Sequence, residues 1–264
     1  MSKPAFFMHV LSDQVAGEVW LNGAPILPLY TDVDQDAYPT ISQWVIHGEN
    51  ELVVHVTDAG ESPMVHVRLC QGHLGGDAKA LRDNVLMAVE WPPPNHPEGE
   101  PAPPIPPRLE VKGQAAHPWG EWYWQRAPAF TDNRATLDAL MAYVRDLHAS
   151  VAAGNMDAVI AQSKIYYDEC FPLYDMQPAD GLAQVRGVWE HVSSKPGFAL
   201  EPFNPDDLDL RLRCGWQLIQ PLTLRGEQLI RQRIHKPGDP QWSLPIFIAR
   251  THFSALEGEL AIVR

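Results

Sequence analysis

A proline-rich segment at residues 91–108, WPPPNHPEGEPAPPIPPR, places the strongest constraint on how this chain can fold. Proline occupies half of its positions. Because proline fixes its own φ and lacks a backbone N–H, the segment can form neither a helix nor a central β-strand. We expect an extended, polyproline-like arm that crosses or links parts of a β-rich domain. The alternative role for the arm is a docking motif for an SH3-like partner.

The residues around this arm show the pattern of an antiparallel β-domain. Asn22-Gly23 lies between two hydrophobic runs, which predicts a tight hairpin because both residues tolerate positive φ. Further short strands are predicted at residues 51–57, 64–70 and 85–91, and after the arm at RLEVKGQ and EWYWQRAP. Regular short strands without helical periodicity are typical of a sandwich. We therefore predict an N-terminal antiparallel β-sandwich over residues 1–128.

Helical periodicity begins after residue 128. Apolar residues recur at three- and four-residue spacing from Leu137 to Leu147, with Thr131 and Asp132 as possible N-caps and Gly154 as the stop. Two further helices are predicted at residues 156–167, capped by Asn155, and at residues 180–192. From Asp207 onward, apolar and polar residues alternate in four segments, DLDLRLRCGWQLIQPLTL, EQLIRQRIH, LPIFIARTHF and GELAIVR. Turns at residues 225–226, 237–240 and 257–258 separate them, which predicts a curved antiparallel sheet of about four strands.

The predicted fold is therefore α+β with two domains, the second an αβ domain over residues 129–264 in which three helices precede the sheet. This order of elements resembles that of the nuclear transport factor 2 and SnoaL-like families. In such a cone, the cluster KIYYDECFPLYD could place Tyr166, Tyr167, Asp168 and Glu169 at the mouth. Cys170 could then be a nucleophile with His191 or His252 as its base. No glycine-rich elbow or oxyanion loop surrounds Cys170, and a buried structural cysteine is the competing interpretation.

Other chemistries find little support in the residues. If strands 51–57 and 64–70 pair, His55 and His66 could be neighbours, but no further histidine stands at a spacing that fixes ligand geometry. The run TDVDQDAY departs from a calcium loop at Ala37, where glycine is needed. Sugar binding on the sandwich would need exposed aromatic rings, for which the candidates are Trp20, Tyr30, Tyr38 and Trp44. No nucleotide, P-loop or metalloprotease motif occurs, so we expect no cofactor, no metal and no catalytic residue.

The charge of the chain favours a basic partner. Its formal net charge is −13, and a nucleic-acid binder needs clustered Lys and Arg instead. Residues 1–128 contribute 7 − 16 = −9 and residues 129–264 contribute 13 − 17 = −4, so the first half is the more acidic. Three cysteines without C-x-x-C spacing suit a reducing cytoplasm. The first twenty residues are too polar for an export signal or a membrane span.

The whole plan resembles the type VI secretion immunity proteins that are paired with restriction-endonuclease-like nuclease toxins. The features that carry this resemblance are the sandwich beginning MSKPAFFMHVLSDQ, the proline arm, and the αβ domain that follows it. The resemblance implies a protein that binds and neutralises its cognate toxin in the cytoplasm and has no turnover of its own. The alternatives are a small-molecule enzyme or binder built on the SnoaL-like cone, and a carbohydrate-binding sandwich.

The residues expected to contact such a toxin follow from charge and from the need for an anchor, since the resemblance transfers no contact positions. Carboxylates can take the place of nucleic-acid phosphates on a basic nuclease surface. An aromatic side chain amid the charges would supply most of the binding energy. The candidate toxin-binding residues are Asp32, Asp34, Asp36, Tyr38, Trp44, Glu49, Glu51, Asp206, Asp207 and Asp209.

Overall fold

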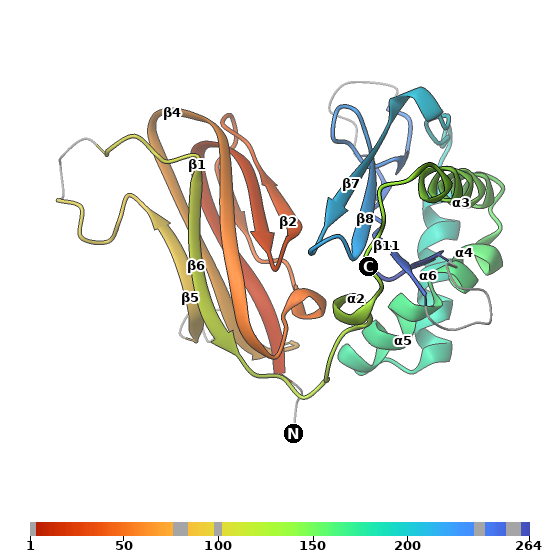
Figure 1. Ribbon diagram of the computed structural model, residues 1–264, viewed down its shortest axis with the longest axis horizontal. Coiled ribbons are helices and arrows are strands. Elements are labelled where there is room, and N and C mark those ends of the chain that lie inside the picture. Colours follow the sequence, from red (N-terminus) through yellow and green to blue (C-terminus); the bar gives the residue numbers. More distant parts are fainter. Residues whose placement is uncertain (1–3, 76–83, 98–101, 235–240, 252–259) are drawn as a thin grey trace. The chain divides into compact units, whose positions relative to one another are not determined.

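The computed structural model divides the chain into two compact units, Met1–Glu121 and Trp122–Arg264 (Figure 1). It describes residues 4–75, 84–97, 102–234, 241–251 and 260–264. The expected boundary near residue 128 lies inside the second unit. The protein is of mixed α+β type with antiparallel sheets. None of the helices in the described ranges has both the length and the apolar character needed to cross a membrane.

The first unit is built on one antiparallel sheet of six strands: β1 (Pro4–Leu21), β2 (Ala24–Leu29), β3 (Gln35–Ala37), β4 (Gly48–His73), β5 (Val85–Trp91) and β6 (Arg108–Ala115). A short 3-10 turn, η1, covers Ser42–Trp44. The hairpin at Asn22-Gly23 is confirmed, and both residues have positive φ, 52° and 80°. The prediction of a strand at residues 85–91 is also confirmed.

The two long strands β1 and β4 pair along both halves of the sheet. Their register shifts between Asp13 and Val15, where the partners change from Met64 to Ala59. On one side of this shift the strand order is β3-β1-β4-β5, and on the other it is β2-β1-β4-β6. In Figure 1, β4 turns over at one end of the unit, an arrangement compatible with the predicted sandwich. Residues 51–57 and 64–70 are both strand, as predicted, but they belong to one continuous strand, β4, and are not separate strands.

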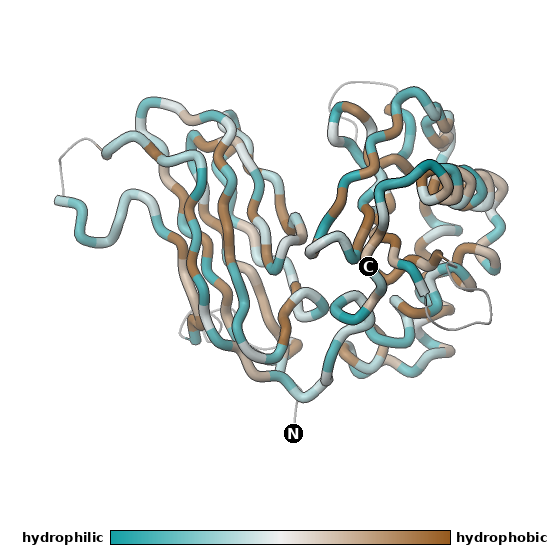
Figure 2. The backbone as a smooth tube through the Cα atoms, viewed as in Figure 1, coloured by the Kyte–Doolittle hydropathy of each residue, from teal (hydrophilic) through white to brown (hydrophobic). Residues whose placement is uncertain are grey.

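The core of the first unit follows the two-residue period of these strands. Phe6, Met8 and Val10 of β1 are buried, and so are Val65, Val67 and Leu69 of β4. Figure 2 shows the corresponding alternation of hydrophobic and hydrophilic residues along the strands. The described parts of the proline arm, residues 92–97 and 102–107, contain neither helix nor strand. The expected absence of helix and strand therefore holds for those residues, but residues 93–96 form a turn in which the His96 N–H donates to the Pro93 carbonyl oxygen at 2.8 Å, so this part is not an extended polyproline arm.

The second unit begins with helices: α2 (Tyr123–Arg126), α3 (Arg134–Ala152), α4 (Met156–Gln162), α5 (Lys164–Leu173) and α6 (Pro178–Ser193). Asn155 caps α4 as predicted, and Gly154 follows α3 with φ of 68°. The N-cap of α3 is Asn133, one residue after the predicted caps, and its Oδ1 accepts from the backbone N–H of Thr136. The helix predicted at 156–167 is two helices, because Ser163 leaves helical geometry at φ −99° and ψ 12°.

The strand predicted at EWYWQRAP is wrong, since the segment forms the single helical turn α2. The Gln125 side-chain oxygen accepts a hydrogen bond from the backbone N–H of Trp122 at 2.8 Å, and the backbone N–H of Gln125 donates to the Trp122 carbonyl oxygen at 3.1 Å. Trp122, Tyr123 and Trp124 are all buried. The three neighbouring aromatic rings are therefore buried on different sides of a helical turn. In so short a segment, the sequence pattern cannot distinguish such a turn from a strand.

The strands of the second unit come last, after the 3-10 turn η2 (Pro205–Asp207). They are β7 (Leu208–Arg213), β8 (Leu218–Thr223), β9 (Ile230–Arg231), β10 (Ser243–Leu244), β11 (Ile248–Arg250) and β12 (Leu260–Ile262). An antiparallel sheet in the order β12-β11-β8-β7 has four strands, as expected, but the first predicted strand, DLDLRLRCGWQLIQPLTL, forms two of them, β7 and β8. The predicted strand EQLIRQRIH is not one of the four, because its strand β9 pairs with β10 in a separate two-stranded sheet.

Helix α3 packs its apolar stripe against this sheet. Leu140 and Val144 join a core with Ile219 and Ile248, while Leu147 joins a second core that includes other helices and strands. Leu137 belongs to the same heptad-like pattern but is 43% exposed, because it lies in the first turn, beyond the edge of the packed stripe. The apolar stripe of α3 thus faces the sheet, as its periodicity predicts.

Candidate functional site

The acidic segment at Tyr30–Asp36 connects the two halves of the first unit's sheet. Strand β2 pairs with the C-terminal half of β1 and ends at Leu29, whereas β3 pairs Gln35 with Ser12 in the N-terminal half. The intervening residues cross from one half to the other on the surface. Asp32, Asp34 and Asp36 are all exposed. The three aspartates were predicted to lie in one acidic loop; Asp32 and Asp34 do, whereas Asp36 lies on strand β3, where it pairs with Leu11.

The side chain of Gln35 holds the acidic segment in place. Its Oε1 accepts hydrogen bonds from Ser12 Oγ at 3.0 Å and from the backbone N–H of Tyr30 at 3.1 Å. Its Nε2 donates to the carbonyl oxygen of Pro28 at 3.0 Å. One amide therefore ties the start of the segment to its end and to β1. A surface loop that is fixed before binding loses less conformational entropy when a partner arrives.

A second carboxylate lies beside Asp34. The pKa of the Asp13 carboxyl is raised above its ordinary value, first by loss of solvent and then by a shared hydrogen bond with Asp34 and by the charge of Asp34. Asp13 is on β1 at the register shift, next to Ser12. Two like charges held together repel each other, so a cation placed between them would be attracted by both. This pair was not predicted, because only the fold brings the two residues together.

Asp36 and Tyr38 are both associated with a buried histidine. The Nε2 of His9 lies 3.4 Å from Asp36 Oδ1, and the His9 ring stacks on Tyr38 with a centroid distance of 4.2 Å. His9 is only 3% exposed. Tyr38 therefore covers His9 with one face of its ring. It is partly buried, and it is less available as a binding anchor than the sequence prediction supposed.

The exposed apolar side chains of this surface are within the segment itself. Tyr30 is 49% exposed and Val33 is 51% exposed. From the sequence, Tyr30 was a candidate only for sugar binding, and Val33 was not a candidate for any site. Their position beside and between the three aspartates could have identified them, because an acidic, solvated segment leaves apolar side chains exposed. We call Tyr30–Asp36 the acidic segment; it combines three carboxylates with two apolar contacts.

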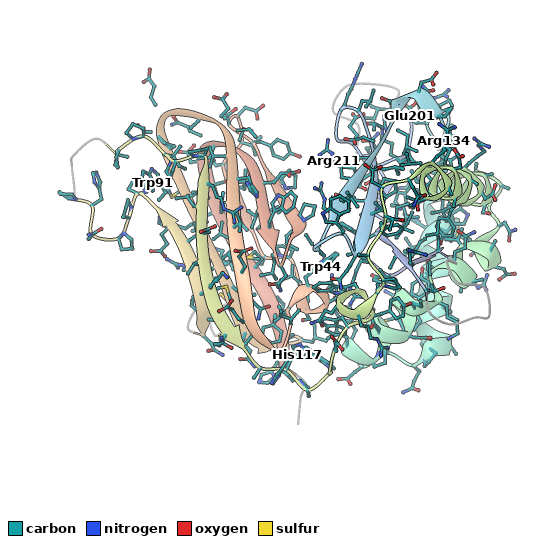
Figure 3. All side chains as sticks on the ribbon, viewed as in Figure 1. Trp44, Trp91, His117, Arg134, Glu201 and Arg211 are labelled. Carbon is teal, nitrogen blue, oxygen red and sulfur yellow. The ribbon has the colours of Figure 1, made fainter. Side chains whose placement is uncertain are left out.

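The other candidates in the first unit lie in different environments. Trp44 is 6% exposed and ends the turn η1; it is labelled in Figure 3. As a buried ring, it is not an exposed anchor, which corrects that prediction. Glu49 and Glu51 are not turn residues, since both lie on β4. Glu49 pairs with Lys112 at 3.3 Å and Glu51 faces Arg108 at 3.8 Å, both on β6, so neighbouring cations already satisfy part of their charge.

The three remaining candidates belong to the second unit. Asp206 and Asp207 form the η2 turn, whose first residues are capped by Asn204. Asp207 Oδ1 accepts from the backbone N–H of Leu224 at 3.3 Å. Asp209 on β7 forms an ion pair with Arg211 at 2.8 Å, and Figure 3 labels this arginine. Much of this acidic group therefore serves local structure.

The residues considered for enzyme chemistry do not form a catalytic arrangement in the described part of the chain. Asp168 forms a surface ion pair with Lys164, whereas Glu169 pairs with the buried guanidinium of Arg264. Burial raises the pKa of the Cys170 thiol to about 11, which disfavours the reactive thiolate. His191 is exposed at the end of α6, and His252 lies outside the described residues.

The two histidines considered for a metal site, His55 and His66, are likewise separated. His55 and His66 lie on the same strand, and β1 pairs them with Glu18 and Leu11, so the prediction that they could be cross-strand neighbours is wrong. Among the described residues, no group of three or more His, Cys, Asp or Glu side chains is arranged to hold a metal ion.

Comparison of the chain with protein-family models, curated proteins and solved structures gives no match in any of the three.

Proposed function

We propose that this protein is an immunity protein that binds and neutralises a secreted nuclease toxin in the cytoplasm of the cell that produces both. The observation that carries the proposal is the acidic segment, in which Asp32, Asp34 and Asp36 are displayed with Tyr30 and Val33 on a backbone held by Gln35. A nuclease surface that binds DNA phosphates is basic, so it offers Lys and Arg side chains to carboxylates.

The electrostatics of the segment suit such a partner. The net charge of −13 attracts a basic protein at long range and speeds association. At contact, a Lys or Arg near Asp34 and Asp13 relieves the repulsion between their carboxyls. The apolar side chains Tyr30 and Val33 then exclude water from the ion pairs, which strengthens them. The segment therefore provides both attraction and a site of close contact.

The helix-then-sheet order of the second unit would also suit a SnoaL-like cone, as the sequence analysis noted. No arrangement of acid, base or nucleophile within the described residues favours a small-molecule reaction over toxin binding. We therefore assign the second unit to the same immunity function.

The proposal is tested with the product of the adjacent gene, co-expressed with this protein and assayed for toxicity, co-purification and DNA degradation. We expect the neighbour to degrade DNA alone and to be inactive in the complex. A variant that combines Asp32→Asn, Asp34→Asn and Asp36→Asn should bind about 100-fold more weakly. Its affinity should also depend less on salt concentration than that of the wild type. A neighbour that is neither toxic nor bound contradicts the immunity function.

A matched control separates a specific contact from a general effect of charge. Asp58, Glu61 and Glu110 are also exposed carboxylates of the first unit, and neutralising these three changes the net charge by the same amount. This control variant should bind within about threefold of the wild type, because distant charges act mainly on the association rate. Equal weakening by both triple variants would place the contact outside the acidic segment.

The role of Gln35 is tested without any change of charge. Gln35→Ala removes the hydrogen bonds to Ser12, Tyr30 and Pro28 and leaves every carboxylate in place. We expect about tenfold weaker binding, because the loosened segment must be ordered on binding. Unchanged affinity in this variant would show that the segment's fixed shape does not contribute.

A further inference from the structure

The turn between β7 and β8 has an unusual backbone. Three consecutive residues adopt left-handed geometry: Cys214 with φ of 49°, Gly215 with φ of 65° and Trp216 with φ of 74°. Glycine adopts this region freely, but for other residues Cβ is crowded by the backbone. A bulky aromatic residue there is a true outlier. The backbone at Trp216 is therefore strained, and glycine would be the better residue for the turn.

This strain does not serve to bury the tryptophan. The side chain of Trp216 is 50% exposed, whereas Cys214 is buried at 8% and Leu218, at the start of β8, is fully buried. A large apolar ring that is both strained and exposed lowers the stability of the free protein on two counts. Backbone strain of this kind is found at functional sites, where the surrounding structure holds it.

Neighbouring hydrogen bonds hold the turn in this geometry. The carbonyl oxygen of Trp216 accepts from the backbone N–H of Phe130 at 2.8 Å. The side chain of Gln217 donates to the carbonyl oxygen of Gln125 at 2.6 Å. Both partners lie in the segment that carries α2 toward α3. These two hydrogen bonds connect the turn to the helical part of the second unit, whereas the side chain of Trp216 remains half exposed.

We propose that Trp216 is a binding anchor that inserts into an apolar pocket of the nuclease, and that basic side chains of the nuclease border this pocket. This inference rests on the proposed function. Tryptophan is the residue most enriched among binding hot spots, where a rigid ring fills a pocket. Its π-face also attracts Lys and Arg, which a nuclease surface supplies. Leu212, 37% exposed, lies near the end of β7 on the same hairpin, four residues before Trp216.

The proposal separates binding from stability. Trp216→Gly removes the ring and suits the left-handed backbone, so we expect a melting temperature equal to or above that of the wild type. Binding to the nuclease, purified as the catalytically inactive product of the adjacent gene, should weaken by about 30-fold or more. A tryptophan with a purely structural role gives the opposite result, a lower melting temperature with unchanged affinity.

Two control variants complete the experiment. Cys214→Gly relieves strain in the same turn but keeps the indole, so its affinity should equal that of the wild type. Among the large apolar side chains of the described residues, Leu224 has the highest exposed fraction, 65%. The Leu224→Ala variant should also bind the nuclease with wild-type affinity. Binding of Trp216→Gly at wild-type strength, or a fall in its melting temperature, overturns the anchor while the proposed function stands. If the wild type does not bind the nuclease, both the function and the anchor are wrong.

Discussion

The carboxylate of Glu169 on α5 and the guanidinium of Arg264 form an ion pair inside the second unit. Their closest atoms, Glu169 Oε2 and Arg264 Nη1, are 2.5 Å apart, and the arginine side chain is 1% exposed. The other oxygen of Glu169 accepts from the backbone N–H of Tyr123 in α2 at 2.6 Å. Arg264 also lies over the ring of Trp122, 5.2 Å from its centroid. One carboxylate thus connects α2, α5 and the strand region that ends at Arg264.

Removing one partner of this pair should destabilise the second unit strongly. Arg264→Met removes the cation that pairs with the Glu169 carboxylate, and Glu169→Gln removes the carboxylate that pairs with the buried guanidinium, so each should lower the free energy of unfolding by about 3 kcal/mol or more. The double variant should lie closer to the wild type than either single variant, since no charge is then left alone. Urea unfolding of the four proteins measures this coupling.

The exposed pair on the same helix provides the control. Lys164 and Asp168 form an ion pair one turn before Glu169, with side chains 70% and 61% exposed. Lys164→Ala should change the free energy of unfolding by less than about 0.5 kcal/mol. A loss as large as that of Arg264→Met would show that burial is not what distinguishes the two pairs.

Asn50 on β4 should tolerate no change of its amide. It is fully buried, its Oδ1 accepts from Ile46 N–H and from Asn22 Nδ2, and its Nδ2 donates to the carbonyl oxygens of Ile46 and Gly48. Asn50→Asp replaces the donor with an oxygen that faces two carbonyls. We expect a loss of about 3 kcal/mol or more near neutral pH, measured by chemical denaturation.

The pH dependence of the Asn50→Asp variant provides a further check. The introduced carboxyl is disfavoured in its charged form, so its folded pKa lies above its unfolded value. The destabilisation is therefore full above the folded pKa and decreases as pH falls toward the unfolded value, because the protonated carboxyl can donate again. Asn84→Asp, at an exposed position where the amide donates to Gln71, should show little effect. Similar losses for both variants would contradict the role of burial.

Gly17 on β1 should be irreplaceable for steric reasons. A Cβ built at this position meets the backbone carbonyl oxygen of His55 at 1.9 Å and the Cα of Val56 at 3.2 Å. Because these are backbone atoms of the paired strand, a rotamer change cannot relieve the clash. Gly17→Ala should therefore destabilise the first unit by about 3 kcal/mol or more, seen in its thermal unfolding.

Gly187 in α6 is a glycine with the opposite expectation. A Cβ there meets nothing within 4 Å, and the position lies inside a helix and is exposed. Gly187→Ala should raise the stability of the second unit by about 1 kcal/mol, because alanine restricts the unfolded chain and favours the helix. If Gly17→Ala and Gly187→Ala changed stability in the same direction and by similar amounts, the steric explanation would be wrong.

Asp13 should make the first unit less stable at neutral pH. Loss of solvent, then the hydrogen bond and charge of Asp34, raise its pKa above the ordinary 3.8. For an acid whose folded pKa is raised, the unfolded state loses its proton first, so stability falls as pH rises from 3.8 through the folded pKa. Asp13→Asn should therefore be more stable than the wild type at pH 7. Unfolding measured from pH 3 to pH 7 should show the two proteins converging at the acidic end.

Several features of this fold could be predicted because their signals are local. The Asn22-Gly23 hairpin, the cap at Asn155 and the stop at Gly154 each depend on the conformational preferences of one or two residues. The strand at residues 85–91 follows from its own alternation. At the candidate site, the same local information placed Asp32, Asp34 and Asp36 together on one exposed segment.

The remaining features depend on residues that are distant in the sequence. Glu49 pairs with Lys112, 63 residues away, and EWYWQRAP becomes a helical turn with Glu169 accepting from it, so local periodicity cannot reveal either contact.

By itself, the sequence determined the β-rich first half, the helices that precede the last strands, and the acidity of the Asp32 segment. Tertiary structure alone decided which carboxylates are already paired, that Asp13 lies beside Asp34, and that Trp216 is exposed on a left-handed turn. The reason is physical: secondary structure follows from local conformational preferences, whereas burial, pairing and strain arise only when distant segments pack together.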